Sequence, residues 1–472
     1  MNVLTSALQD CIRQKEQQAD GTENSPWRLK LHLMPPTGFL NDPNGLCYFQ
    51  GLWHVFFQYA PFSPQGGLKC WGHYTSPDLL HWTYWGVPLL PDQPFDCHGE
   101  YSGSAIVRDG VLHLFFSGNL FLEGNPPRAF SVIHVTSEDG FHFSPKKVVV
   151  SPEDYPKQCS CQIRDPKVWQ DGNSYRMVIG AQTTHQTGAL LFYHSQDLEN
   201  WQFDRLLQPD VPFGYMWECP DVFSVGDSAY LSVSPQGVDA EPDRYANIFQ
   251  AVWTPLAEPS AFRYTEWDKG FDFYAPQTFE APDGRRILYG WMGMDALGGY
   301  TNPTAEWGWQ HALTLPRVIT EKNGILCQFP VGELQQLRRD PCPIEPTRPL
   351  PLPLELSLNN PENLPFVLDL GPGLHFSFEP DRQTMKLYFT DSSGFGRTER
   401  HTKAATCRCL QAWIDTSSVE IFSNNGKEVF TSRFYPSSDS LKLTLHADCS
   451  CQLTAWPLEH MTFEKKQILI QN

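Results

Sequence analysis

Three carboxylic acids lie within two residues of a proline, each in aromatic surroundings. Asp42 stands in "LNDPNGLCYF", Asp165 in "IRDPKVW" and Glu218 in "MWECPDVF". Each segment alone indicates a turn, because proline fixes φ, glycine tolerates positive φ, and Asn and Asp hydrogen-bond their own backbone. The recurrence of the same device needs a shared explanation. Carboxyl groups that meet in one site can share the work of nucleophile and general acid.

The elements that would position these acids are short strands. From about residue 31, runs such as "LWHVFFQY", "VLHLFFSG" and "RRILYGWM" alternate with Gly, Asp, Asn and Pro turns, a pattern typical of an all-β chain. One segment recurs as "SPDLLHW", "SEDGFHF" and "SQDLENW", starting at Ser76, Ser137 and Ser195, so the starts lie 61 and 58 residues apart. Such a period holds four short strands with their loops and predicts propeller blades. The length of residues 30–335 predicts five blades.

Other segments of the chain differ from this pattern. A polar helix over about residues 4–19 lies in an N-terminal extension, residues 1–29. The Pro-rich stretch "RRDPCPIEPTRPLPLPLEL" predicts a linker over residues 336–355. Beyond it, residues 356–472 alternate apolar and polar side chains between turns, which predicts a β-sandwich. The predicted fold is therefore all-β, a five-bladed β-propeller followed by a C-terminal β-sandwich.

A propeller would bring the three acids together, because the ends of its innermost strands surround one channel. Asp42, Asp165 and Glu218 fall in different predicted blades, each near a strand end. Aromatic residues make up 13% of the chain and include 15 Trp, and such flat rings suit sugars as well as β cores. Three carboxylates among flat rings would suit glycoside hydrolysis, in which one acid attacks the anomeric carbon and another protonates the leaving oxygen. That chemistry needs no cofactor.

Composition excludes several other functions and partners. A formal net charge of −18 argues against nucleic acid or an anionic membrane as a partner, because both need a basic surface. The first residues carry charges throughout and lack the apolar core of a signal peptide. Thirteen Cys, an odd number, fit reduced thiols better than a disulfide framework. We therefore predict a cytoplasmic protein.

Cysteine and histidine residues raise the question of a metal site. The sequence contains three Cys-x-Cys pairs: Cys159/Cys161, Cys407/Cys409 and Cys449/Cys451. The last two lie in predicted strands, where residues i and i+2 share a face, so their four thiols could converge on a soft metal such as zinc. The spacing is not that of structural zinc sites, and we interpret the cysteines as small buried side chains. His73 and His81 lack metal-ligand spacing and are expected to make hydrogen bonds within a blade. We predict no metal.

Eight motifs in order carry a resemblance to a known family. "LNDPNG", "YWGVPLLP", "YSGS", "IRDP", "ECP", "GFDFYAPQ", "LYGWM" and "WGWQHALTLPR" resemble segments of glycoside hydrolase family 32, which contains invertases and sucrose-6-phosphate hydrolases. The segment "SSVEIFSNNGKEVFTSRFYP" resembles the β-sandwich of that family. The resemblance covers nearly the whole chain and implies a retaining β-fructofuranosidase without a cofactor.

The resemblance also implies roles for individual residues. Asp42 would be the nucleophile that forms a covalent fructosyl-enzyme, Glu218 the acid and then the base, and Asp165 the group that holds the fructosyl hydroxyls. The nucleophile must be ionised while the acid keeps a proton near neutral pH, so we expect Glu218 to have the raised pKa. The fructosyl unit would be bound by eight further residues, of which the aromatic ones have ordinary blade core as the less favoured alternative: Asn41, Gln58, Trp71, Tyr101, Ser102, Arg164, Tyr274 and Trp291.

The substrate expected from this resemblance is a small fructoside, because long polymers do not enter a cell intact. "GGLKCWGH" resembles a segment of the sucrose-6-phosphate enzymes, so Lys69 is either a point charge near a phosphate or a solvated loop cation. We predict hydrolysis of sucrose, sucrose 6-phosphate or both. A fructosyltransferase or a hydrolase of short fructo-oligosaccharides would use the same site. A sugar-binding propeller without chemistry should lack at least one of the three acids, and this chain has all three.

Overall fold

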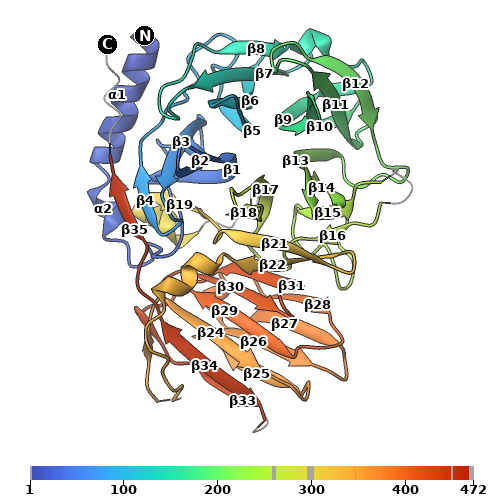
Figure 1. Ribbon diagram of the computed structural model, residues 1–472. Coiled ribbons are helices and arrows are strands. Elements are labelled where there is room, and N and C mark those ends of the chain that lie inside the picture. Colours follow the sequence, from blue (N-terminus) through green and yellow to red (C-terminus); the bar gives the residue numbers. More distant parts are fainter. Residues whose placement is uncertain are drawn as a thin grey trace.

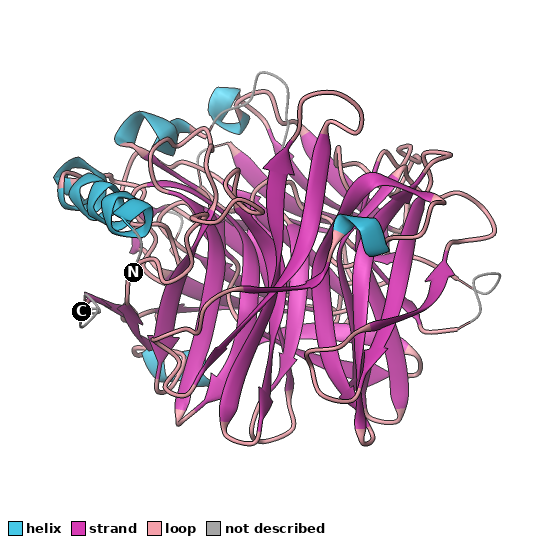
Figure 2. Cartoon of the chain, turned by 90° about the horizontal axis from the view of Figure 1, so that it is seen from above, coloured by secondary structure: helices cyan, strands magenta, loops and turns pink. Residues whose placement is uncertain are grey.

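The computed structural model describes residues 3–257, 262–294, 302–345, 347–371, 373–447 and 450–466. Five sheets stand around a common centre, and two further sheets lie face to face beneath them (Figure 1). Seen from above, strands make up most of the molecule and the helices lie on its outside (Figure 2). The prediction of an all-β propeller followed by a sandwich is confirmed.

The first three blades each contain four consecutive strands in chain order from the centre outward, and two further strands extend the sheet of the first blade. The first blade contains β1 (Gly38–Phe49), β2 (Leu52–Ala60), β3 (Cys70–Ser76) and β4 (His81–Tyr84). The second contains β5 (Glu100–Arg108), β6 (Val111–Phe121), β7 (Arg128–Ser137) and β8 (Lys147–Val150). The third contains β9 (Cys159–Asp171), β10 (Ser174–Thr183), β11 (Gly188–Ser195) and β12 (Gln202–Leu207).

The last two blades complete the ring. The fourth contains β13 (Met216–Val225), β14 (Ser228–Gln236), β15 (Val252–Pro255) and β16 (Thr265–Glu266). The fifth contains β17 (Tyr274–Glu280), β18 (Arg286–Met292), β21 (Arg317–Lys322) and β22 (Ile325–Pro330), with β20 (Ala312–Leu313) beside β18. The innermost strands β1, β5, β9, β13 and β17 contact one another in this order, and β17 contacts β1. The five units that the length predicts are therefore present as a closed ring.

The recurring segment is a turn built by a serine and an aspartate. In the first blade, the Ser76 hydroxyl accepts the backbone N–H of Leu79 at 2.8 Å, and Asp78 accepts that of His81 at 2.9 Å. The same bonds recur at the turns that begin with Ser137 and Ser195. Ser and Asp side chains stabilise turns by bonding nearby backbone in this way. The turn ends the third strand of each of these blades, which explains the period in the sequence.

A pair of histidines occurs in each of the first two blades, and three of these four side chains are buried. His54 Nδ1 lies 3.0 Å from His73 Nε2, and His113 Nδ1 lies 2.9 Å from His134 Nε2. Burial lowers the pKa of His54 to about 4, and burial together with the charge of His113 lowers the pKa of His134 to about 4. His73 therefore makes a hydrogen bond within its blade, as predicted, and His81 does so with Asp78 at 2.7 Å.

The second domain is a sandwich of two five-stranded sheets. One sheet has the order β31 (Glu428–Arg433), β30 (Ser418–Ser423), β29 (Cys409–Ile414), β24 (Leu354–Asn359), β34 (Gln452–Pro457). The other has the order β28 (Glu399–Lys403), β27 (Thr384–Phe389), β26 (Leu374–Glu379), β25 (Phe366–Asp369), β33 (Thr444–Ala447). Leu356, Phe376, Leu387 and Ile421 belong to the core that these sheets enclose. Side chains along β25 and β27 alternate between buried and partly exposed, whereas every residue of β30 and β31 is buried.

The two ends of the chain meet at the edge of the first blade. Helix α1 (Val3–Gln17) packs Ile12 against Cys70 and Leu90, and α2 (Asp20–Glu23) follows it. Strand β35 (Thr462–Lys465) pairs in parallel with β4, so the predicted sandwich range, 356–472, is wrong for this strand (Figure 1). An unpaired blade edge exposes backbone donors and acceptors, and the returning strand covers them. The other predicted domain boundaries stay predictions.

No helix in the described part of the chain is both long and apolar enough to cross a membrane.

Candidate active site

Each innermost strand of the propeller has a bulge at the same end. The strand register shifts after Leu40, Glu100, Glu218 and Tyr274, and between Arg164 and Lys167. A bulge turns side chains away from the regular alternation of a strand. The five bulges bring to one place the segments that carry the predicted site residues: residues 41–43, 101–103, 164–167, 218–221 and 274–277.

The prolines beside the acids belong to these bulges. Pro43, Pro166 and Pro220 follow Asp42, Asp165 and Cys219 in the sequence. Proline has no N–H to give to a sheet ladder and is therefore tolerated in strands at bulges. Asp165 and Cys219 have positive φ values of 68° and 46°, a conformation that side chains rarely adopt outside functional or tightly packed sites. The acid-next-to-proline pattern is thus the local signal of a bulge that re-aims the acid.

A cavity of about 250 Å³ lies where the bulges meet. Its lining includes nine of the eleven residues that the sequence predicts for the site, together with five others: Phe39, Asn41, Asp42, Gln58, Gln65, Gly66, Gly67, Lys69, Tyr101, Arg164, Asp165, Glu218, Tyr274 and Trp291. The two predicted residues outside the lining are Ser102, which bonds to Asp42, and Trp71. Trp71 is fully buried, and its Nε1 donates to the Tyr101 carbonyl at 3.0 Å. It supports the pocket wall from behind.

Asp42 lies among donors at the cavity. Ser102 Oγ donates to its Oδ2 at 2.5 Å, and the Cys219 thiol lies 3.6 Å from the same oxygen. Desolvation by the surrounding protein raises the pKa of Asp42 above its ordinary value, the Ser102 hydrogen bond opposes this, and the charge of Glu218 adds to it. The site therefore contains carboxylates that repel one another, with a hydroxyl donor that favours the charged form of Asp42.

Asp165 is held by backbone. The N–H of Cys219 donates to its Oδ2 at 3.0 Å, and its own N–H donates to Ser117 Oγ at 2.9 Å. Burial raises the pKa of Asp165 to about 7, the charge of Arg164 opposes this rise, and the charges of Glu218 and Asp42 increase it. The carboxylate cluster consequently holds a proton near neutral pH.

Glu218 accepts more hydrogen bonds than the other two acids. Arg164 Nε donates to its Oε1 at 2.9 Å, while the Tyr274 hydroxyl and Gln236 Nε2 donate to its Oε2 at 2.7 and 2.8 Å. Such donors fix the orientation of the side chain. The expectation that Glu218 carries the proton during the reaction stays a prediction. Gln236 was missed by the sequence analysis, because no motif surrounds it.

Lys69 lines the cavity and is not a solvated loop cation. Its Nζ donates to Asn41 Oδ1 at 2.7 Å and lies 4.1 Å from the centre of the Phe39 ring. Asn41 Nδ2 in turn donates to Gln58 Oε1. The chain of bonds from Lys69 through Asn41 to Gln58 fixes one wall of the pocket.

A buried ion cluster supports the wall that carries Tyr101. The Lys146 ammonium lies 3.0 Å from Asp92 and 2.6 Å from Asp96, and it also pairs with Glu100, which directly precedes Tyr101. The side chains of Asp96 and Glu100 are fully buried. Lys146 therefore compensates charges that would otherwise be buried unpaired.

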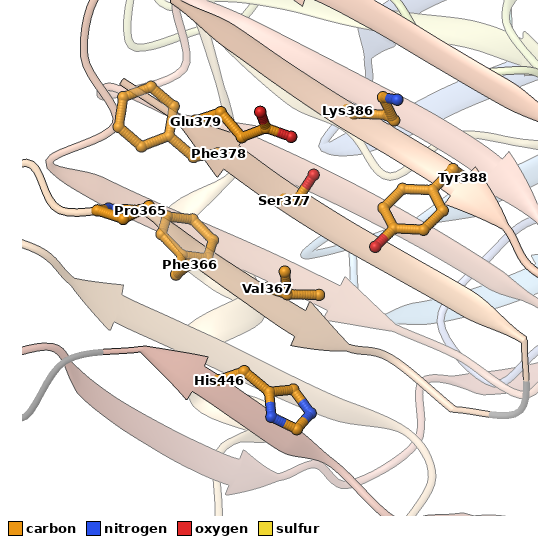
Figure 3. A pocket seen from close by; sticks show the side chains of 9 residues that line it. All are labelled: Pro365, Phe366, Val367, Ser377, Phe378, Glu379, Lys386, Tyr388 and His446. Atoms are coloured by element: carbon orange, nitrogen blue, oxygen red, sulfur yellow. The ribbon is translucent and has the colours of Figure 1, made fainter. Parts of the chain in front are cut away.

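A larger hollow, about 490 Å³, lies on the sandwich (Figure 3). It is lined by residues in or next to β25, β26, β27 and β33 (Figure 3), of which Phe366 and Phe378 belong to the buried core of the sandwich. Glu379 is the one carboxylate in its lining. This hollow lacks the pair of acids that glycoside hydrolysis needs, so the smaller cavity of the propeller is the candidate active site.

In the described part of the chain, no group of three or more His, Cys, Asp or Glu side chains has an arrangement that could hold a metal ion. Cys449 lies outside the described residues. Cys407 is buried, whereas Cys159, Cys161, Cys409 and Cys451 are only partly buried, so the interpretation as buried side chains fits one of these five.

Comparison with known proteins gives the class and then the family. The models of the glycosyl hydrolases family 32 N-terminal and C-terminal domains match residues 32–330 and 373–457. A sucrose-6-phosphate hydrolase of Escherichia coli is 38% identical over 444 residues, covering 88% of this chain and 91% of that protein. A raffinose invertase of Escherichia coli is 37% identical over 453 residues, covering 89% of this chain and 92% of that protein.

Solved structures agree with these relatives. The sucrose-6-phosphate hydrolase of Lactobacillus gasseri has a TM-score of 0.86 at 28% identity, covering 95% of this chain and 97% of that one. A Bombyx mori β-fructofuranosidase in complex with sucrose has a TM-score of 0.86 at 27% identity, covering 97% and 99%. The prediction of a glycoside hydrolase of the β-fructofuranosidase type is confirmed. The chain belongs to glycoside hydrolase family 32.

Proposed function

We propose that this enzyme hydrolyses sucrose 6-phosphate and sucrose in the propeller cavity, with retention through a covalent fructosyl-enzyme. The observation that carries the proposal is the convergence of Asp42, Asp165 and Glu218, from three innermost strands, on one cavity. Relatives named sucrose-6-phosphate hydrolase, at 38% and 37% identity, support the choice of substrate. A phosphorylated sugar is made inside a cell, which fits a cytoplasmic enzyme.

Asp42 is the nucleophile in this proposal. It must be ionised when it attacks the anomeric carbon of the fructosyl unit, and the Ser102 hydroxyl at 2.5 Å stabilises that form. Its carbon–oxygen bond to fructose replaces the bond to the leaving glucosyl oxygen, so the configuration inverts once here and once again on hydrolysis. The product keeps the β configuration.

Glu218 is the general acid and then the general base. Its proton passes to the glucosyl oxygen as the fructosyl bond breaks, and the carboxylate then takes a proton from the attacking water. Arg164, Tyr274 and Gln236 hold the side chain in place. Asp165 would hold the fructosyl hydroxyls, and its proton, with a pKa of about 7, would complete the hydrogen bonds to them.

Steady-state hydrolysis of sucrose and sucrose 6-phosphate by the purified protein tests the proposal. We expect fructose from both sugars, with a kcat/KM at least tenfold higher for the phosphorylated sugar, which corresponds to about 1.4 kcal/mol of transition-state preference. A higher yield of free glucose than of free fructose at high sucrose concentration would indicate transfer to sugar instead of water. Turnover of neither sugar would overturn the proposal.

A further inference from the structure

A hairpin of the second blade extends past the cavity. Glu100, at the start of β5, pairs with Gly118 of β6, and β6 continues for three more residues to Phe121, which pairs with Arg128 at the start of β7. At about 3.3 Å per residue, Arg128 lies roughly 10 Å beyond the end of β5. Because the pocket residue Tyr101 belongs to that same end of β5, the hairpin stands at the mouth of the cavity.

Arg128 is fixed there by aromatic rings. Its guanidinium carbon lies 4.6 Å from the centre of the Phe121 ring, 5.4 Å from that of Phe130 and 5.9 Å from that of Tyr101. Stacking on rings holds a guanidinium plane while its N–H groups stay free at the edge. Burial raises the pKa of Tyr101, and the charge of Arg128 is the largest effect opposing that rise. The guanidinium therefore lies within electrostatic reach of a hydroxyl in the pocket wall.

The two cations that line the cavity already have polar partners. Arg164 bonds to Glu218 at 2.9 Å and to Gln162 at 2.7 Å, and Lys69 bonds to Asn41. The Arg128 guanidinium makes no hydrogen bond and no ion pair with any residue in the described ranges, although the chain has 53 acidic residues. Its five N–H donors are thus available to a ligand at the mouth.

The side of the cavity on which Arg128 stands is that of the leaving group. Glu218 would protonate the glucosyl oxygen, so the glucosyl unit extends from Glu218 toward the mouth. Arg164, which bonds to Glu218, lies 5.5 Å from the centre of the Phe130 ring, and Arg128 lies 5.4 Å from the centre of the same ring, so one aromatic side chain links Arg128 to the partner of Glu218. An anion carried on the far end of the glucosyl unit would consequently approach Arg128 before any other uncommitted cation among the described residues.

We propose that Arg128 determines specificity by binding the phosphomonoester of the leaving group, with its planar fork donating two N–H groups to phosphate oxygens. The inference rests on the proposed function and deepens it. It assigns the phosphate to Arg128 of the β6–β7 hairpin, whereas the sequence alone suggested Lys69.

The test compares Arg128→Gln and Arg128→Lys with the control Arg205→Gln. Arg205 stacks on Phe192 at 4.9 Å on the outermost strand of the third blade, so it matches the stacking but not the location. The measured quantity is the ratio of kcat/KM for sucrose 6-phosphate to that for sucrose. We expect Arg128→Gln to lower the ratio at least tenfold, Arg128→Lys to give an intermediate value, and the control to leave it within twofold of wild type.

Product inhibition supplies a readout that does not depend on phosphorylated substrate turnover. Glucose 6-phosphate should inhibit sucrose hydrolysis by the wild type more strongly than glucose does. Arg128→Gln should lower the ratio of the inhibition constant of glucose to that of glucose 6-phosphate at least tenfold. A ratio and an inhibition constant both within twofold of wild type, in variants with wild-type circular dichroism, would overturn the inference. If wild-type protein prefers sucrose 6-phosphate and the variants keep that preference, only the inference fails. If wild-type protein hydrolyses neither sugar, the proposed function itself fails.

Discussion

Replacement of Glu218 by glutamine isolates proton transfer from the other tasks of this side chain. The amide has the shape of the carboxylate, its oxygen can still accept from Arg164 Nε at the 2.9 Å site, and the Tyr274 hydroxyl can turn to accept from the new NH₂ group. Fold and sugar binding should therefore survive. General acid–base catalysis contributes about 10²- to 10⁴-fold in rate. At about 1.36 kcal/mol per factor of ten, the barrier should rise by about 3 to 5 kcal/mol.

The assay compares two leaving groups. We expect Glu218→Gln to lower kcat/KM for sucrose by about 10²- to 10⁴-fold. For a nitrophenyl β-fructofuranoside, kcat/KM should fall much less, because its leaving group departs without protonation. The constant kcat/KM includes only the steps up to the first irreversible one, so the later hydrolysis step does not affect it. Glu199→Gln is the control, since Glu199 is 56% exposed and pairs with Lys147 at the surface. A loss below fivefold for sucrose, or equal losses for both substrates, would refute the role of proton donor.

Three further effects follow from the contacts of single side chains. Ser102→Ala removes a hydrogen bond that stabilises ionised Asp42, so the pKa of Asp42 should rise further. The acid limb of the pH profile of kcat/KM should therefore move to higher pH. An acid limb at the wild-type pH contradicts this. Lys146→Met leaves two fully buried carboxylates unpaired and should lower the free energy of unfolding in urea by about 3 to 5 kcal/mol. The control Lys147→Met breaks an exposed ion pair and should lower it by less than about 1 kcal/mol. Equal losses in the two variants contradict this. The pKa of His134 falls from 6.5 to about 4 on folding, so its contribution of roughly 3 kcal/mol to the free energy of unfolding is complete above pH 6.5 and is lost as the pH falls to 4. His134→Gln should therefore reduce the loss of thermal stability between pH 7 and pH 5. An unchanged loss contradicts this.

Local chemistry explains what the sequence could predict. The turns at Ser76, Ser137 and Ser195 are built by side chains bonding to backbone two or three residues away, so each leaves a readable signature. The fourth and fifth blades have no such turn among their described residues, and their presence could only be inferred from length. The acid-next-to-proline segments were readable for the same reason, because a bulge is made by neighbouring residues.

Long-range register accounts for what the sequence could not predict. Trp71 belongs to a matching motif, yet its place in β3 buries it behind the pocket wall. Gln236 reaches Glu218 through the pairing of its strand with Met216, 20 residues earlier, and nothing near it in the sequence indicates this. The return of β35 to the first blade likewise depends on which edge is open, a property of the whole fold.

The most direct test of the account is to trap the fructosyl-enzyme. Glu218→Gln protein should react with the nitrophenyl β-fructofuranoside and then hydrolyse slowly, because the general base for the second step is missing. After acid quenching and proteolysis, mass spectrometry should find one fructosyl group on the peptide that contains Asp42, and none when Asp42→Asn is also present. An adduct on Asp165 or on another side chain would contradict the account.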